Sequence, residues 1–138
     1  VYAGTINVNA NLNTSGGGAN GDILLKASGN ISLASGKTIT TTGGDVTFWA
    51  DSDGNGTGYA QMSTNSSITT SGGLGGAITL GGGTDITTGY ARGEATRDSV
   101  TEPLYDLYIS GVNLQSGTSL TSGGGDIILD DACNENER

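Results

Sequence analysis

The pattern most typical of metal chemistry in this sequence is the stretch D-S-D-G-N-G-T at residues 51–57. Asp51, Asp53 and Asn55 place a side-chain oxygen at every second residue, and the glycines permit the sharp turn that gathers such oxygens around Ca²⁺. The glutamate that would complete an EF-hand loop is missing, because Met62 stands at its position. We therefore predict a partial calcium site at these three residues, and the alternative is a turn that caps its own backbone.

A second candidate is the segment 90–105, Y-A-R-G-E-A-T-R-D-S-V-T-E-P-L-Y, which interrupts the repeats of the chain and holds two of its five basic residues. Long loops on a rigid scaffold often carry function, so we consider a loop that binds a glycan or a protein. The alternative is a solvated loop that covers one side of the scaffold. The residues expected to make the contact are Tyr90, Arg92, Glu94, Arg97, Asp98 and Tyr105, with Trp49, Tyr59 and Tyr108 as further aromatic platforms.

Aspartates recur at the start of short apolar stretches, next to a glycine, and could stack as a row of carboxylates (Asp45, Asp106 and Asp126). Such rows serve polysaccharide-cleaving β-helices, but an aspartate beside a glycine corner is more simply a cap of that corner. The chain has no histidine and no basic residue near these aspartates. We therefore expect no enzymatic activity, because a general acid–base constellation is missing.

Threonines recur as well, and a flat face of regular T-x-T rows could bind ice. The threonines that could line up are Thr40, Thr69, Thr87 and Thr121. The second residue of the row varies among threonine, serine and glycine, so we favour ordinary surface positions of β-strands.

Composition narrows the class of protein. The chain has 138 residues, of which 33% are hydrophobic and 26 are glycine, and its net charge is −9. A phosphate backbone would be repelled by this surface, so we expect no nucleic-acid partner. No apolar run reaches the roughly 18 residues of a membrane helix, so we expect no membrane insertion. The single cysteine, Cys133, either bridges two chains or is an incidental tail residue.

The strands and turns that must position these candidate residues are predicted from one repeated sequence motif, called the phrase below. The phrase is clearest at residues 31–45, I-S-L-A-S-G-K-T-I-T-T-T-G-G-D, and is repeated at 112–126 and 60–73. Each copy has a central aliphatic residue, an apolar residue six positions earlier, and Gly or Asn three positions earlier. Gly and Asn tolerate a left-handed backbone, so we expect a tight turn there. After the centre we expect two outward residues, such as Thr40 and Thr41, and then a glycine corner. The centres are Leu12, Ile39, Ile68, Ile86 and Leu120, the earlier apolar residues Ile6, Leu33, Met62, Leu80 and Leu114, and the turn residues Asn9, Gly36, Asn65, Gly83 and Gly117.

Short strands joined by corners and repeated with linked spacing predict an all-β parallel β-helix, or β-solenoid, of roughly five irregular coils with Gly-rich corners. We expect one solenoid domain over residues 1–131, with loop insertions at about 51–59 and 90–105, and an acidic polar tail at 132–138. An antiparallel β-sandwich is the alternative architecture.

The repeats, and most of all G-G-D-V-T-F-W-A-D-S-D-G-N-G-T-G at residues 43–58, resemble the β-strand-repeat shafts of filamentous-haemagglutinin-like bacterial surface adhesins. The resemblance implies a right-handed parallel β-helix and an extracellular or cell-surface structural role. N-P-N motifs of the family's export module are missing, since Pro103 is the only proline, so the resemblance is to the shaft. No catalytic residue carries over.

From these observations we expect an extracellular structural segment of a surface fibre or adhesin. Exposed coil ends or lateral faces would support self-association, with an end-to-end filament as the result, because open sheet edges template further pairing. A host or environmental glycan or protein is the other expected partner. No cofactor is certain, and Ca²⁺ is the candidate.

Overall fold

The computed structural model describes residues 1–14, 21–72, 76–87 and 111–130. The described residues form thirteen β-strands and no helix, so none of them belongs to a helix that could span a membrane. The strands alternate apolar and polar residues, the period of a strand with one buried face.

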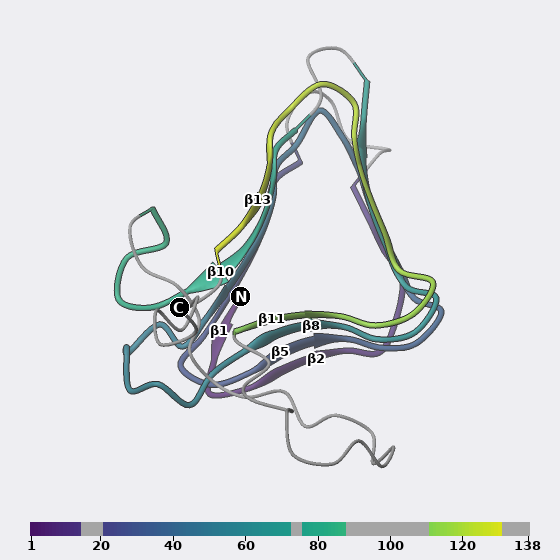
Figure 1. Cartoon of the computed structure of the whole chain (residues 1–138). Coiled ribbons are helices and arrows are strands. Elements are labelled where there is room, and N and C mark those ends of the chain that lie inside the picture. The colour runs from purple at the N-terminus through teal and green to yellow at the C-terminus, as the bar shows by residue number, and fades with distance from the viewer. Residues whose placement is uncertain (15–20, 73–75, 88–110, 131–138) are drawn as a thin grey trace, which may run out of the picture.

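The strands assemble into three parallel sheets that form the sides of a triangle (Figure 1). The chain visits the sheets in the order A, B, C and then returns to A one coil higher. This confirms the parallel β-helix and excludes the antiparallel sandwich. Sheet A contains β1 (Tyr2–Ala3), β4 (Ile23–Ala27), β7 (Val46–Ala50), β10 (Ile78–Gly82) and β13 (Ile127–Leu129); sheet B contains β2 (Ile6–Val8), β5 (Ile31–Leu33), β8 (Ala60–Met62) and β11 (Val112–Leu114); sheet C contains β3 (Leu12–Asn13), β6 (Thr38–Thr42), β9 (Ser67–Ser71) and β12 (Ser119–Ser122).

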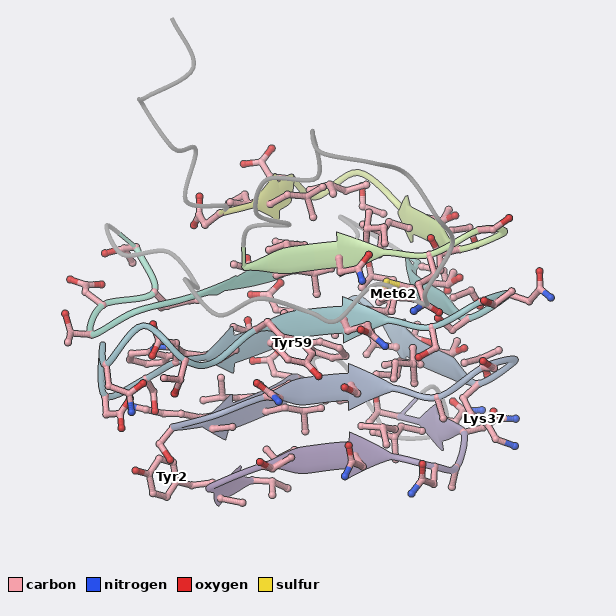
Figure 2. All side chains as sticks on the ribbon, turned by 60° about the horizontal axis from the view of Figure 1, so that its bottom comes forward. Tyr2, Lys37, Tyr59 and Met62 are labelled. Atoms are coloured by element: carbon pink, nitrogen blue, oxygen red, sulfur yellow. The ribbon has the colours of Figure 1, made fainter. Side chains whose placement is uncertain are left out.

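The coils wind right-handed, as the views along and across the axis show together (Figures 1 and 2). A right-handed path is the usual one for parallel strands of one sheet. In the part of the chain that the structure describes, four coils carry a strand in all three sheets, and β13 begins a fifth. The predicted insertion at 51–59 lies between β7 and β8, whereas the predicted insertion at 90–105 and the tail at 132–138 lie outside the described residues.

The register between coils confirms the predicted centres of four of the five copies of the phrase. Ile39 pairs with Leu12, Ile68 with Ile39, and Leu120 with Ile68, so the central residues form one inward column in sheet C. At the turn before sheet C, Gly36, Asn65 and Gly117 have positive φ angles of 67°, 59° and 73°, as predicted.

The copy centred on Ile86 is wrong. Leu80 pairs with Phe48 in sheet A and therefore does not stack on Met62 in sheet B. Ile86 follows β10 in a turn. The run of glycines at 81–83 imitates the turn of the phrase, and Gly83 does have a positive φ of 82°, but this conformation belongs to the corner after sheet A.

The first coil also differs from the prediction. Val8, and not Ile6, pairs with Leu33, because Ile6 pairs with Ile31. Val8 and Leu12 are four residues apart, whereas Leu33 and Ile39 are six apart, so this turn is two residues shorter. Asn9 accordingly lacks the positive φ of its predicted counterparts.

Inward residues of the three sheets form one narrow apolar core along the axis. Fully burying a large aliphatic or aromatic side chain contributes about 1.5–3 kcal/mol, and stacking coils makes this burial continuous. The buried apolar residues are Val8, Leu25, Ala27, Ile31, Leu33, Ile39, Val46, Phe48, Ala50, Ala60, Met62, Ile68, Ile78 and Leu80.

A repeated hydrogen bond closes the corner between sheets C and A. Thr41 was expected on the outside beside Thr40, but its side chain is fully buried, because strand alternation turns one of the two threonines inward. Its hydroxyl reaches across the corner to a glycine carbonyl oxygen, which would otherwise be left without a partner in the core. The four coils repeat this bond as Thr14 to Gly21, Thr41 to Gly44, Thr70 to Gly76 and Ser122 to Gly125.

The same glycines leave no room for a side chain. A Cβ on Gly76 would lie 2.0 Å from the carbonyl oxygen of Gly44 in the coil below, and a Cβ on Gly44 would lie 2.6 Å from that of Gly21. Glycine at this corner is therefore required by the close approach of successive coils.

Candidate cation site at the corner after β7

The loop 51–58 is attached to the solenoid at both of its ends. The amide of Asp51 donates to the carbonyl oxygen of Gly29 at 3.1 Å, and that of Ser52 donates to Ala27 at 3.0 Å, both in the coil below. A Cβ on Gly58 would lie 2.5 Å from the Asp51 nitrogen and 2.6 Å from the Gly29 oxygen. The chain therefore leaves the coil at Asp51, turns, and returns to the same point at Gly58.

Asp51 turns into this closed loop because its backbone is left-handed, with a φ of 49°. Its side chain is fully buried. One carboxylate oxygen, Oδ1, accepts a hydrogen bond from the Gly56 amide at 3.0 Å, whereas Oδ2 is buried with no hydrogen-bond partner. An ionisable group in this situation needs compensation, because burial of an isolated charge is strongly unfavourable.

Asp53 and Asn55 behave differently from Asp51. Both are exposed, and Asp53 accepts hydrogen bonds from the amide nitrogen and from Nδ2 of Asn55 at 3.3 and 2.9 Å. Asn55 Oδ1 in turn accepts from the amide of Thr57 at 2.9 Å. These two side chains therefore cap their own turn, as the alternative interpretation of the sequence describes.

A metal site with several acidic side chains is not formed in the described part of the chain. No group of three or more Cys, Asp or Glu side chains that could hold a metal occurs among those residues. Of the three predicted ligands, only Asp51 offers a carboxylate oxygen that is both buried and without a partner. Any cation at this loop would therefore depend on one carboxylate, completed by backbone carbonyl oxygens and water.

Sequence reasoning placed Asp51 among the loop oxygens and missed its burial. Strand alternation directs Val46, Phe48 and Ala50 inward, so the same alternation would direct residue 51 outward. The left-handed backbone at Asp51 reverses this direction. The only signal in the sequence is the residue type, since Asp tolerates this conformation better than most residues do.

The predicted aromatic platforms occupy separate places. Trp49 lies on the outer face of sheet A, where its Nε1 donates to Gly83 at 2.7 Å and the Lys26 ammonium lies 3.6 Å from the ring centroid. This cation–π contact covers one face of the ring. Tyr59 directly precedes β8 and lies along sheet B (Figure 2). Tyr108 and the predicted loop contacts, from Tyr90 to Tyr105, lie outside the described residues, as does Cys133.

The predicted row of aspartates is interrupted in the described residues. Asp45 and Asp126 share a corner column, but Ala77 stands between them, and Asp106 lies outside the described residues. Asp22 Oδ1 accepts from the Asp45 amide at 2.9 Å, and Asp45 Oδ1 accepts from the Ala77 amide at 2.8 Å. Asp126 has the corresponding position in the next coil, since its neighbour Ile127 pairs with Ile78. Each bonded aspartate therefore caps the corner of the coil above it, as the simpler interpretation predicts.

The predicted threonine row is formed in part. Thr40, Thr69 and Thr121 stack in register on the outer face of sheet C. Thr87 is not part of this row, because it lies in the turn after β10, where its amide and hydroxyl both donate to Asp85.

No family model matches the chain, and no curated protein or solved structure shows significant similarity to it.

Proposed function

We propose that this chain is a structural segment of an extracellular fibre or adhesin shaft, and that copies of it stack end to end into a filament. The observation that carries the proposal is the exposure of core positions in β13. Ile127 and Leu129 pair with the fully buried Ile78 and Leu80, so they belong to inward columns, yet each is 44% exposed. A further coil on this end would bury them.

The opposite end of the described solenoid offers matching columns. Ile6, Val8 and Leu12 in the first coil occupy the same columns as Val112, Leu114 and Leu120 in the last complete coil. A second copy would therefore continue three apolar columns and three parallel ladders of backbone hydrogen bonds. Open sheet edges of this kind template further strand pairing.

The extracellular setting has its support in the sequence. It rests on the resemblance of residues 43–58 to adhesin shafts and on an acidic composition with few lysines. Labelling of intact source cells with an antibody against the folded segment checks this part of the proposal. Labelling that requires permeabilised cells would contradict it.

Charge substitution in β13 tests the assembly itself. Leu129→Lys places an ammonium in an inward column, and Ile128→Lys is its matched control, because Ile128 is similarly exposed at 40% but stacks on the outward Thr79. We expect filaments of wild type and of Ile128→Lys by electron microscopy and light scattering, and monomers of Leu129→Lys with an unchanged circular dichroism spectrum.

Two outcomes would overturn this assembly. Wild type that stays monomeric across a wide concentration range would show that the ends do not associate. Disassembly by Ile128→Lys but not by Leu129→Lys would show that copies join through the outer face of sheet A instead.

A further inference from the structure

The fully buried carboxylate of Asp51 is not balanced by any positive group of the described chain. Lys26 lies over the Trp49 ring on the outer face of sheet A, and Lys37 lies at the corner between β5 and β6, where it points away from the solenoid (Figure 2). The amino group of Val1 donates to the Leu24 carbonyl oxygen at 2.8 Å. Asp51 Oδ2 itself has no hydrogen-bond partner.

We propose that Asp51 binds one hard divalent cation of the calcium class inside the loop 51–58. Ca²⁺ takes carboxylate, carbonyl and water oxygens, and it tolerates irregular geometry. The free Oδ2 supplies the charged ligand. The remaining ligands would be backbone carbonyl oxygens of the loop, together with water.

The backbone of the loop suits this task. Gly54 and Gly56 have positive φ angles of 68° and 81°, and Gly58 brings the returning chain against Asp51. Such a backbone turns its peptide groups in directions that a regular strand does not allow. The bond from the Gly56 amide to Oδ1, at 3.0 Å, ties the carboxylate to the far side of the loop, and Oδ2 of the same group is left buried and unpartnered.

A comparison with the other buried side-chain oxygen that lacks a hydrogen bond supports the choice of Asp51. That oxygen is the hydroxyl of Ser66, in the turn between β8 and β9. A buried hydroxyl is neutral, so leaving it without a partner costs far less than leaving a carboxylate without one. Among the described residues, Asp51 alone therefore combines burial, negative charge and a free oxygen.

One carboxylate makes a weak site. We expect a dissociation constant of about 10⁻⁴–10⁻³ M, the range of extracellular calcium modules. At a Ca²⁺ concentration ten times this constant, binding to the folded state alone raises Tm by about 5 °C for a chain of this size. The ion would act as a structural brace of the corner.

Terbium luminescence and thermal melting test the proposal on the whole chain. Tb³⁺ replaces Ca²⁺, and Trp49, the only tryptophan, lies two residues from Asp51 and can sensitise its emission. We expect saturable emission that Ca²⁺ displaces, and a Tm that rises with Ca²⁺ and falls with chelator. Equal stabilisation by K⁺ at the same ionic strength would overturn the choice of a divalent ion.

The matched pair Asp51→Asn and Asp53→Asn locates the site. Both remove one negative charge from the loop, but only Asp51 is buried. We expect Asp51→Asn to abolish the calcium-dependent rise in Tm and Asp53→Asn to weaken binding by no more than a few fold. Equal loss in both variants would move the site to the exposed turn and overturn the proposal. The wild type tests the proposal even if Asp51→Asn fails to fold. If the wild type shows neither saturable Tb³⁺ emission nor a calcium-dependent Tm, the proposal is overturned.

Discussion

The hydroxyl of Thr41 donates a hydrogen bond across a corner of the solenoid to the carbonyl oxygen of Gly44, three residues later, and both groups lie in the core. Its neighbour Thr40 points outward in the same strand. The pair shows how one residue type serves two functions in adjacent positions, since one threonine satisfies a buried carbonyl group and the other covers an exposed sheet.

Thr41→Val removes this hydroxyl while it keeps the shape of the side chain. We expect a loss of about 1–3 kcal/mol in the free energy of unfolding, because the Gly44 carbonyl group remains buried without its partner. Thr40→Val is the control, with an expected change within about 0.5 kcal/mol. Urea denaturation of the two variants measures the difference, and equal effects would contradict the assigned role of the corner bond.

Gly76→Ala tests the close approach of the coils. The new Cβ would lie 2.0 Å from the Gly44 carbonyl oxygen, a backbone atom that also accepts the corner bond from Thr41. We expect a loss of several kcal/mol, on the scale of severe core overpacking, or failure to fold. Gly4→Ala is the control, since nothing lies within 4 Å of its added Cβ. Thermal melts followed by circular dichroism compare them.

Substitution of Gly36 tests the effect of the left-handed backbone alone. An added side chain would cause no steric clash there, because no atom lies within 4 Å of a Cβ built on Gly36. Its φ of 67° is matched by 59° at Asn65 in the next coil. We expect Gly36→Ala to lose about 1–2 kcal/mol from left-handed strain and Gly36→Asn to lose clearly less. If chemical denaturation gives the two variants equal stability, the conformation does not explain the choice of Gly and Asn.

Substitution of Asp45 tests whether the aspartates of the corner column cap the coil that follows. Asp45→Ala leaves the Ala77 amide without its acceptor, and we expect a loss of about 0.5–2 kcal/mol, as for other caps of backbone amides. Asp45→Asn retains an oxygen at the same place and should recover most of this loss. Amide hydrogen exchange at Ala77 gives a local measurement, and an unchanged exchange rate in Asp45→Ala would exclude the cap.

The sequence was sufficient to predict the parallel β-helix because the same residue types recur in the same columns. Ile39, Ile68 and Leu120 occupy equivalent strand positions in successive coils of sheet C, so the same residue type returns once in each coil. The error at Ile86 arose because the glycines 81–83 satisfy a turn pattern that belongs to a different corner. Residue types in a turn do not record which two sheets that turn connects.

The candidate site was less predictable than the fold. The pattern D-x-D-x-N located the loop correctly, but the direction of each oxygen depends on backbone angles that vary from one residue to the next. Asp51 turns inward because its φ is positive, while Asp53 and Asn55 bond each other at the surface. Threonine burial was missed at Thr41 for a related reason, since two adjacent threonines of a strand must face opposite sides.

The side-chain caps between coils have a direction along the axis. Oxygens of Asn11, Asp22, Asn30 and Asp45 each accept an amide of the coil that follows, at Thr38, Asp45, Tyr59 and Ala77. Gln115, which accepts from Thr64 of the coil before, is an exception. Each of these bonds forms when its two coils meet, so the direction is a property of the axis itself. The solenoid is therefore polar along its axis, and any filament made from it would have two chemically different tips.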